Sequence, residues 1–478
     1  MGGAPVALSA ASLWQAQAAF YAERGVRAWS GNAVPHHVTT NPRIARSYAE
    51  LAAAWARDAL ADAGEASLAP TPLWVVELGC GSGRFAHLFL RAWEDLEAAG
   101  GTRGLALRYV ATDLVAANVD FLLAHPAVAA DVAAGRLAGQ AFDPTADAPL
   151  AVLPPAAGPA PLVAVVANYV LDSLPVDVFV VRDGAPAEAR VRGESAGVAR
   201  GLAPLDWAVV PCDPAARYPG EPALTATLQA ALAAGARAHG RVLPFPAGAL
   251  RAIDRLGVLT PHPMLWLASD KGAVPGDGPA AAVADAPPDL EVHGDASGAC
   301  VSTVVDFGAV AGHVERGGGE ALLPAHGSTA LYTAAWVTRG AAGRRLRGAF
   351  ARRVGDTGPD DDYYVLRRLT HPARPYAVAE ALALLRWSGG DPHLWADGFG
   401  TLMPALAREG AALGAPLLRE LRDVAATVAR RWYDIGEPAD VNFQLGSALL
   451  AVGALDAAEA RFAASAAARG AGAATLVQ

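Results

Sequence analysis

Three glycines stand at alternate positions in the stretch VVELGCGSGRFAHLF, residues 75–89, where they follow an apolar run and one acid, Glu77. Because glycine has no Cβ, Gly79, Gly81 and Gly83 can adopt backbone angles closed to other residues and can let a ligand lie against the main chain. Glu77 could hold such a loop by accepting backbone N–H groups, or it could bind a cationic group of the ligand. The stretch therefore predicts a ligand-binding turn between a strand and a helix.

Two common nucleotide-binding patterns do not fit this turn. The dinucleotide pattern G-x-G-x-x-G requires a glycine at position 84, where the chain has Arg84, and a P-loop requires a lysine after its last glycine. The remaining pattern, apolar-apolar-Glu-x-Gly-x-Gly-x-Gly, resembles motif I of the class I S-adenosylmethionine (SAM) methyltransferases. This resemblance implies that the cofactor is SAM.

A SAM site needs further groups at the ends of the strands that follow. Asp113 ends the stretch RYVATD, and its two oxygens can accept hydrogen bonds from both ribose hydroxyls of an adenosine. Phe142 and Asp143 end the next stretch, GRLAGQAFD, where an aromatic ring and an acceptor for the adenine amine are useful. Asp143 precedes Pro144 and equally fits a plain turn residue. Asn168 ends PLVAVVAN, beside the crevice where open α/β sheets bind ligands.

The residues next to Asn168 are the candidates for catalysis. Methyl transfer from SAM requires an in-line approach of the nucleophile and help in losing its proton, because the sulfonium is already an activated donor. Tyr169, Asp172 and Asn168 are the first candidates for this role, and His36 and His37 are the second. The alternative for Tyr169 is a packing residue in the wall of the crevice, and a histidine pair in a loop is more often simply exposed than catalytic.

A parallel sheet would bring these residues to one edge. From residue 73 to about 170, short runs rich in valine and leucine alternate with helical stretches, which predicts βαβ units. A helix over 42–64 with Asn41 as its N-cap is expected before them, and a β-hairpin insertion with a helix is expected over about 176–250. PMLWLASDKG, STVVDF and ALYTAAWV are predicted as further strands, the last two as a closing pair. The predicted fold class is α/β, a Rossmann-like class I methyltransferase sheet with an N-terminal helical segment and an all-α C-terminal module.

The chain is predicted to have three parts. Strand patterns end at about residue 340, and the acidic stretch GDTGPDDD, residues 355–362, is expected to be a linker. The parts are an N-terminal helical segment that forms a cofactor lid (1–65), a methyltransferase domain (66–345) and a helical module (360–478).

The last part of the helical module resembles one tetratricopeptide repeat. In the stretch from residue 443, Leu445-Gly446, Ala458 and Phe462 fall at the spacing of that family, and a generic alanine-rich helical hairpin fits the same residues. No cluster of candidate catalytic residues follows residue 345. We therefore predict that this module folds on its own and binds a protein substrate or partner, and that a chain ending near residue 350 still binds SAM.

Composition and charge exclude several classes of function. The chain has 478 residues, enough for two domains or more, and its net charge of −9 speaks against a nucleic-acid surface. Cys80, Cys212 and Cys300 are widely separated, with no CxxC pair and no clustered histidines, so we expect free thiols, a reducing compartment and no metal site. Apolar stretches are too short or too interrupted for a signal peptide or a membrane span, which predicts a cytoplasmic protein.

Several separated motifs resemble one family, the MidA-type SAM-dependent methyltransferases, which is linked to protein arginine methylation and to assembly of respiratory complex I. The resemblance runs over most of residues 35–340. Besides ELGCGSGRF, it rests on HVTTNPRIARSYAEL (37–51), NYVLDSLPVDVF and LASDKG. It implies that the N-terminal segment folds over the cofactor.

Two departures from this family concern the acceptor. The family has a glutamate directly after the asparagine of this strand, where the chain has Tyr169, and its aspartate-tyrosine-glycine turn reads Asp270-Lys271-Gly272 here. A guanidinium stays protonated and needs acidic side chains that draw its charge away, and Asp172 offers only one. We therefore expect an amine, hydroxyl or amide acceptor, in a protein or a small molecule. The alternative function is a helical-repeat interaction protein with a vestigial methyltransferase fold.

Overall fold

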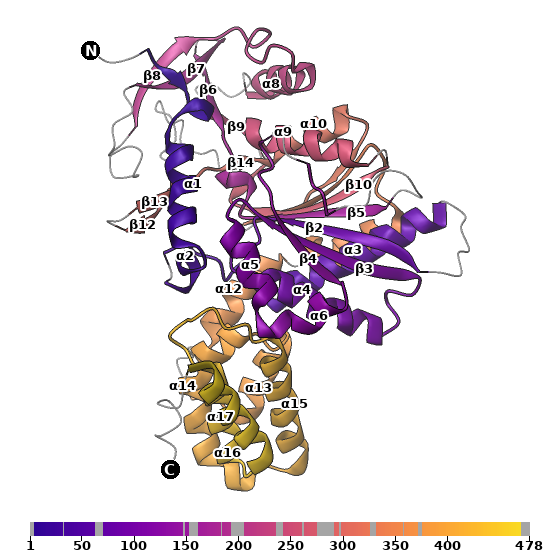
Figure 1. Ribbon diagram of the computed structural model, residues 1–478, viewed down its shortest axis with the longest axis vertical. Coiled ribbons are helices and arrows are strands. Elements are labelled where there is room, and N and C mark those ends of the chain that lie inside the picture. Colours follow the sequence, from indigo (N-terminus) through magenta and orange to yellow (C-terminus); the bar gives the residue numbers. More distant parts are fainter. Residues whose placement is uncertain are drawn as a thin grey trace.

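The computed structural model in Figure 1 describes most of the chain. The described residues are 4–31, 33–62, 70–146, 149–152, 161–182, 184–192, 205–235, 242–260, 262–274, 291–295, 298–325, 331–356, 358–370 and 375–469.

A seven-stranded sheet in the order β15-β16-β10-β5-β2-β3-β4 forms the centre of the fold. Its strands are β2 (Thr71–Leu78), β3 (Leu105–Asp113), β4 (Leu137–Ala141), β5 (Leu162–Asn168), β10 (Met264–Asp270), β15 (Glu320–Leu322) and β16 (Tyr332–Thr338). The five strands from β10 to β4 are parallel, and β16 runs antiparallel to both β10 and β15. The strand order reverses at β2 and β5, which opens a crevice at their carboxyl ends. The predicted fold class is confirmed.

Helices cover both faces of this sheet, because its strands alternate apolar side chains between two cores. Leu73 and Val75 of β2 belong to one core, and Val76 and Leu78 belong to the other. The helices of the first core are α3 (Pro42–Asp62), α4 (Arg84–Ala98), α5 (Ala116–Ala124), α6 (Ala129–Ala133) and α11 (Arg344–Phe350). Those of the second are α8 (Pro222–Gly235), α9 (Ala247–Leu256) and α10 (Phe307–Arg316). The expected cap of α3 is present, since Asn41 Oδ1 accepts from the N–H groups of Arg43 and Ile44.

The predicted insertion is a second sheet, at the top of Figure 1. It contains β6 (Asp177–Arg182), β7 (Ala185–Arg192), β8 (Asp206–Pro211) and β9 (Val242–Phe245), and the hairpin of β6 and β7 is confirmed. The N-terminal strand β1 (Val6–Ala7) also pairs with β7. This strand was not predicted, because two residues are too few to form a pattern. Helices α1 (Leu13–Arg24) and α2 (Arg27–Ser30) follow β1.

The prediction that STVVDF closes the central sheet is wrong. Its residues Val305–Asp306 form β14, which pairs with β11 (Gly272–Ala273), and Asp306 accepts from Ala309 N–H and so begins helix α10. The edge strand is β15. The strand predicted in ALYTAAWV is confirmed as β16, where Trp336 lies directly opposite Trp266 of β10 and their rings stack with centroids 5.6 Å apart. A hairpin of β12 (Glu291–Asp295) and β13 (Gly298–Ser302) lies beside α1.

After β16, the described residues form helices and turns, as predicted. The helices of the C-terminal region are α12 (Pro359–Leu369), α13 (Val378–Trp387), α14 (Pro392–Glu409), α15 (Ala415–Arg431), α16 (Val441–Ala451) and α17 (Leu455–Arg469), and a π-helical turn (Ala351–Gly355) follows α11. Most of them form the lower bundle in Figure 1. None of the helices in the described ranges is long and apolar enough to cross a membrane.

Two predictions for this region concerned a linker at residues 355–362 and a tetratricopeptide repeat near the C-terminus. The linker prediction is wrong for residues 359–362, because Pro359 and three aspartates form the first turn of α12, where carboxylates are favourable. The hairpin of α16 and α17 brings Gly446 against Phe462, whose ring lies 2.7 Å from the position of a Cβ on Gly446. A tetratricopeptide repeat remains a prediction for this hairpin.

Candidate functional site

Two neighbouring cavities lie over the carboxyl ends of the parallel strands. The loop cavity, of about 720 Å³, is lined by the glycine loop, the end of β5 and residues of the N-terminal segment. The strand-end cavity, of about 1270 Å³, is lined by the ends of β3 and β4 and by helix α1. Both are lined by Tyr21, Trp29, Gly79, Tyr169 and Ser173, so they adjoin each other at the switch point of the sheet, and the two together are called the crevice below.

The three glycines of the loop all adopt left-handed backbone angles, with φ of +65° at Gly79, +54° at Gly81 and +82° at Gly83. A side chain at any of them would also collide with a neighbour: a Cβ on Gly81 would lie 2.9 Å from the Trp29 ring, and one on Gly83 would lie 2.8 Å from the Tyr433 hydroxyl. Gly79 and Gly81 line the crevice. Gly83 lines neither cavity and is the N-cap of α4, so its place is structural.

Asp113 joins the glycine loop to the next strand. Its Oδ2 accepts from Gly81 N–H at 2.8 Å, and its Oδ1 accepts from Val115 N–H at 2.8 Å and from Asn118 Nδ2 at 3.1 Å. Burial raises the pKa of this carboxyl, although these hydrogen bonds oppose that effect. Asp113 lines the strand-end cavity, where its carboxylate can accept from a polar ligand.

Glu77 is buried at the floor of the loop cavity and is 4% exposed. Its Oε2 accepts from the Tyr109 hydroxyl at 2.9 Å. Among the hydrogen bonds of the described residues, none joins the Glu77 carboxyl to an N–H group of the glycine loop. Burial raises the pKa of Glu77 to about 8, with Asp113 adding to the effect and the Tyr109 bond opposing it. A cationic group entering the cavity would therefore meet a carboxyl that is mostly neutral at pH 7.

Phe142 and Asp143 lie at the other end of the crevice and both line the strand-end cavity. Phe142 is buried, and the Arg255 guanidinium lies over its ring, 5.7 Å from the centroid. Asp143 Oδ1 accepts from the backbone N–H and the hydroxyl of Thr145, at 2.7 and 2.6 Å. Asp143 is thus a turn residue that also faces the cavity.

Asn168 is held at the end of β5 by the N-terminal segment. Its Oδ1 accepts from the Tyr48 hydroxyl at 2.9 Å, and its Nδ2 donates to the carbonyl of Thr39 at 3.5 Å. Asn168 and Thr39 both line the loop cavity. The segment that the family resemblance folds over the cofactor therefore contacts a predicted site residue directly.

Tyr169 lies at the junction of the two cavities. Its φ of +52° is in the left-handed region, which costs a residue with a side chain about 1–2 kcal/mol. The backbone holds this angle, because Tyr169 N–H donates to the Ser269 carbonyl at 3.1 Å. The ring lines both cavities and packs beside Val38 and Leu394, so it acts as a wall of the crevice in addition to any role in catalysis.

Asp172 lines the loop cavity and lies beside a second carboxyl that sequence reasoning missed. This second acid, Asp270, is fully buried, and its Oδ2 accepts from the N–H groups of Leu171 and Val170. Burial and the neighbouring Asp172 charge raise the pKa of Asp270 well above its ordinary value. Asp270 fixes the turn after β5 through these two hydrogen bonds, while Asp172 faces the cavity.

The two candidate histidines lie in a buried cluster. His36 Nε2 lies 2.9 Å from Nη1 of Arg84, and ligand atoms of His36, His37 and Glu437 lie within 4.8 Å of one another. This grouping resembles a metal site, which the sequence did not predict. The Arg84 guanidinium, however, already lies between the imidazole and the carboxylate and supplies the positive charge, which disfavours a metal ion there. His36 also lines the loop cavity.

The aromatic lid of the crevice was missed at the level of sequence. Trp29 of α2 packs on Gly81, and the ring of Tyr21 of α1 stacks on Trp29 with centroids 5.7 Å apart. Both line the two cavities, where an aromatic face suits an adenine ring or a sulfonium. The only signal in the sequence was the number of aromatic residues between Trp14 and Trp29.

Comparisons with known proteins give a distant likeness. No protein-family profile and no curated protein matches the chain. Among solved structures, a "likely methyl transferase from Burkholderia thailandensis bound to S-adenosyl-homocysteine" is 18% identical with a TM-score of 0.45, over 73% of this chain and 91% of that one. An uncharacterized protein from the same organism is 18% identical with a TM-score of 0.38, over 65% of this chain and 78% of that one. At these TM-scores the function has to be inferred from the site itself.

Proposed function

We propose that the chain is a SAM-dependent methyltransferase that transfers a methyl group to a protein or small-molecule acceptor. The observation that carries this proposal is the contact between Gly81 and Asp113. A glycine loop in left-handed conformation and an acid from the end of the adjacent strand meet at 2.8 Å in one crevice, at the switch point of the sheet. The bare glycine backbone lets the methionine part of SAM lie close to the main chain. The Asp113 carboxylate can accept hydrogen bonds from both ribose hydroxyls of its adenosine part.

Different residues of the crevice would bind different parts of the cofactor. Asp113 would accept from the ribose hydroxyls, with Phe142 and Asp143 near the adenine, because all three line the strand-end cavity. Gly79 and Gly81 would lie under the methionine moiety, and Glu77 would bind its amino group. SAM supplies an activated methyl group, so the protein has only to orient the acceptor and take up its proton.

The acceptor side favours a nucleophile less basic than a guanidinium. Asp172 and the mostly neutral Glu77 are the acids among the described residues that line the loop cavity, and Lys271 adds a positive charge. Asp270 is beneath this surface with its Oδ2 already bonded to two backbone N–H groups. A bidentate pair of carboxylates for an arginine is thus lacking there, and the polar groups of Tyr169 and Asn168 suit an amine, hydroxyl or amide.

The finer features of the proposal come from sequence patterns. Two of the motifs that resemble the MidA type, the glycine loop and the one that begins at Asn168, line the crevice and support a relation to that family. Three cysteines without a disulfide support an activity in the cytoplasm. The C-terminal helices, with their tetratricopeptide-like hairpin, are proposed to contact a protein substrate or partner.

Mass spectrometry of the purified protein for bound SAM or S-adenosylhomocysteine, followed by calorimetric titration, tests the cofactor. We expect no binding by Gly81→Val, because the valine would collide with the Trp29 ring that covers the loop and would strain a backbone with a φ of +54°. Gly135→Val is the matched control, since Gly135 has a similar φ of +66° with open space around it and lines neither cavity. We expect Asp113→Ala to lose about 1–3 kcal/mol of binding free energy. Equal affinity of wild type and Gly81→Val for SAM would refute the proposed cofactor site. If the wild type does not bind SAM, the alternative function, a helical-repeat interaction protein with a vestigial methyltransferase fold, becomes the better explanation.

A further inference from the structure

The chain between α15 and α16 returns from the helical bundle to the glycine loop. Tyr433 is 1% exposed and belongs to the same core as Phe85 and Phe89 of α4. Its ring stacks on His125 with centroids 3.8 Å apart, and its hydroxyl lies close to Gly83. Residues 432–437 therefore pack directly behind the loop, about 350 positions later in the chain.

Arg84, the first residue of α4, binds this returning segment. Its guanidinium donates to Glu437 Oε2 at 2.5 Å and Oε1 at 3.2 Å, and to the Tyr433 carbonyl at 3.3 Å. It also lies 2.9 Å from His36 Nε2. Arg84 is only 2% exposed, so the N-terminal segment, the glycine loop and the C-terminal segment meet at one buried cation.

The buried charge of Arg84 requires its ion pair with Glu437. An arginine keeps its proton, so a buried Arg84 requires an anion close by. Burial alone would raise the pKa of Glu437, but the hydrogen bonds in the cluster and the Arg84 charge lower it to about 2, and it is ionised at neutral pH. The Arg84 bonds matter most, because His36 lies 3.7 Å from Glu437 Oε1. Removing the carboxylate would leave the cation unpaired next to Gly83.

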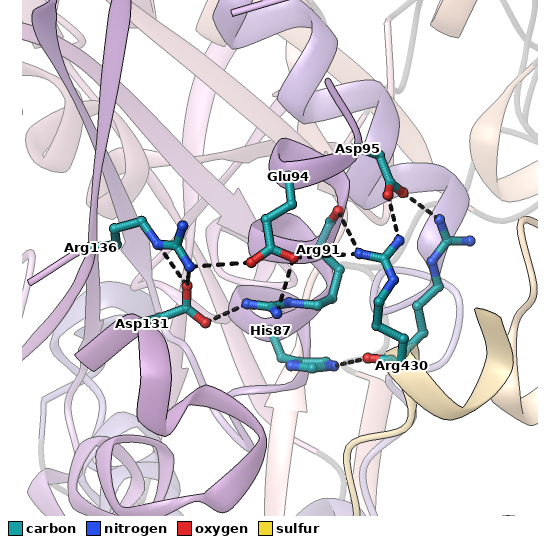
Figure 2. Close-up of polar contacts among 8 residues, drawn as sticks. His87, Arg91, Glu94, Asp95, Asp131, Arg136 and Arg430 are labelled. Carbon is teal, nitrogen blue, oxygen red and sulfur yellow. Dashed lines mark hydrogen bonds and ion pairs between the residues drawn. The ribbon is translucent and has the colours of Figure 1, made fainter. Parts of the chain in front are cut away.

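The other end of α4 is bound to the same region, as Figure 2 shows. Asp95 accepts from Arg430 at 2.5 Å and from Arg431 at 2.8 Å, and His87 Nε2 lies 3.2 Å from the Arg430 carbonyl. The end of α15 thus contacts α4 along its length. Since the glycine loop ends in the first turn of α4, the position of this helix sets the position of the loop.

We propose that the segment 432–437 supports the cofactor site from behind, and that Glu437 positions the glycine loop through Arg84. This inference rests on the proposed function for its effect on SAM, but the order of the loop can be measured without any ligand. It opposes the expectation from sequence that a chain ending near residue 350 keeps its cofactor site.

Hydrogen–deuterium exchange of the whole chain tests whether Glu437 orders the glycine loop. Titration with S-adenosylhomocysteine tests whether that order is needed for binding. For Glu437→Gln we expect at least fivefold faster exchange of the amides over residues 79–86, and at least tenfold weaker binding. Glu459→Gln is the control, because Glu459 is an exposed glutamate of α17 in the same region, and it should change neither quantity.

A double variant separates positioning from stability. Arg84→Met/Glu437→Met replaces the buried ion pair by apolar side chains, which often preserves stability. We expect it to recover the melting temperature that Glu437→Gln loses, while the loop still exchanges fast and binding stays weak. Wild-type exchange in Glu437→Gln, or recovery of both exchange and affinity in the double variant, would overturn the inference. A wild type without affinity for the ligand would count against the proposed function, and the exchange comparison would still decide the role of Glu437.

Discussion

Cofactor binding should release a proton from Glu77. Burial raises the pKa of this carboxyl to about 8, so it is roughly nine-tenths protonated at pH 7. If the amino group of the cofactor binds beside it, the new positive charge favours the ionised form. We therefore expect about 0.9 proton to leave per bound cofactor at pH 7, and affinity to rise about tenfold between pH 6 and pH 7.

Calorimetric titration with S-adenosylhomocysteine measures this release. The titration is repeated at pH 7 in buffers of different ionisation enthalpy, and the slope of the binding enthalpy against the buffer enthalpy gives the number of protons released. Glu77→Gln preserves the shape of the side chain and lacks the proton, so its slope should fall close to zero. Exposed Glu459 serves again as the control position, and Glu459→Gln should give the slope of the wild type.

The result that would refute this reasoning is an equal slope in wild type and Glu77→Gln. It would mean that Glu77 keeps its proton in the complex and that its partner remains the Tyr109 hydroxyl. Weaker binding by Glu77→Gln without a change in slope would point to a packing role for the side chain.

Further predictions concern stability, the acceptor and the C-terminal region. The pKa of Glu77 is 4.5 in an unfolded chain and about 8 in the fold, so the folded state holds this proton longer and its stability should fall as pH rises through that window, by about 5 kcal/mol at most. Urea unfolding at pH 5, 7 and 9 should show this loss in the wild type and a smaller one in Glu77→Gln. In a methyl-transfer assay on arginine-rich peptides and on cell extract, wild type and Tyr169→Phe should form no methylarginine, and methylarginine formed readily by the wild type would contradict the proposed acceptor. A chain ending at residue 350 lacks Tyr433 and Glu437 and should bind S-adenosylhomocysteine at least tenfold more weakly than the full chain. Unchanged affinity would instead support the prediction that the C-terminal module is independent of the cofactor site.

Most of the local structure could be predicted from the sequence, because local patterns specify it. Short runs rich in valine and leucine, separated by helical stretches, marked the strands of the parallel sheet. The left-handed angles of Gly79, Gly81 and Gly83 follow from a turn that only glycine forms without strain. Asn41 caps α3 because its side chain reaches the first N–H groups of the helix. Asp113 lies in the crevice because the carboxyl ends of parallel strands meet at one edge.

The contacts between distant segments were decided only by the tertiary structure. Asp172 lies beside Asp270 and raises its pKa because β5 and β10 are neighbours in the sheet. Residues Val305–Asp306 of STVVDF pair with β11 and lead into helix α10, so β15 forms the edge of the central sheet. Arg84 and Glu437 stand 353 residues apart, and by themselves they look like an ordinary charged residue at the start of a helix and one in a turn between Gly436 and Pro438. A sequence pattern reports the local backbone and which side of it is buried, but the partner of a buried charge depends on how whole elements pack against each other. For that reason the sequence by itself determined the glycine loop of this protein, and the fold determined what holds that loop in place.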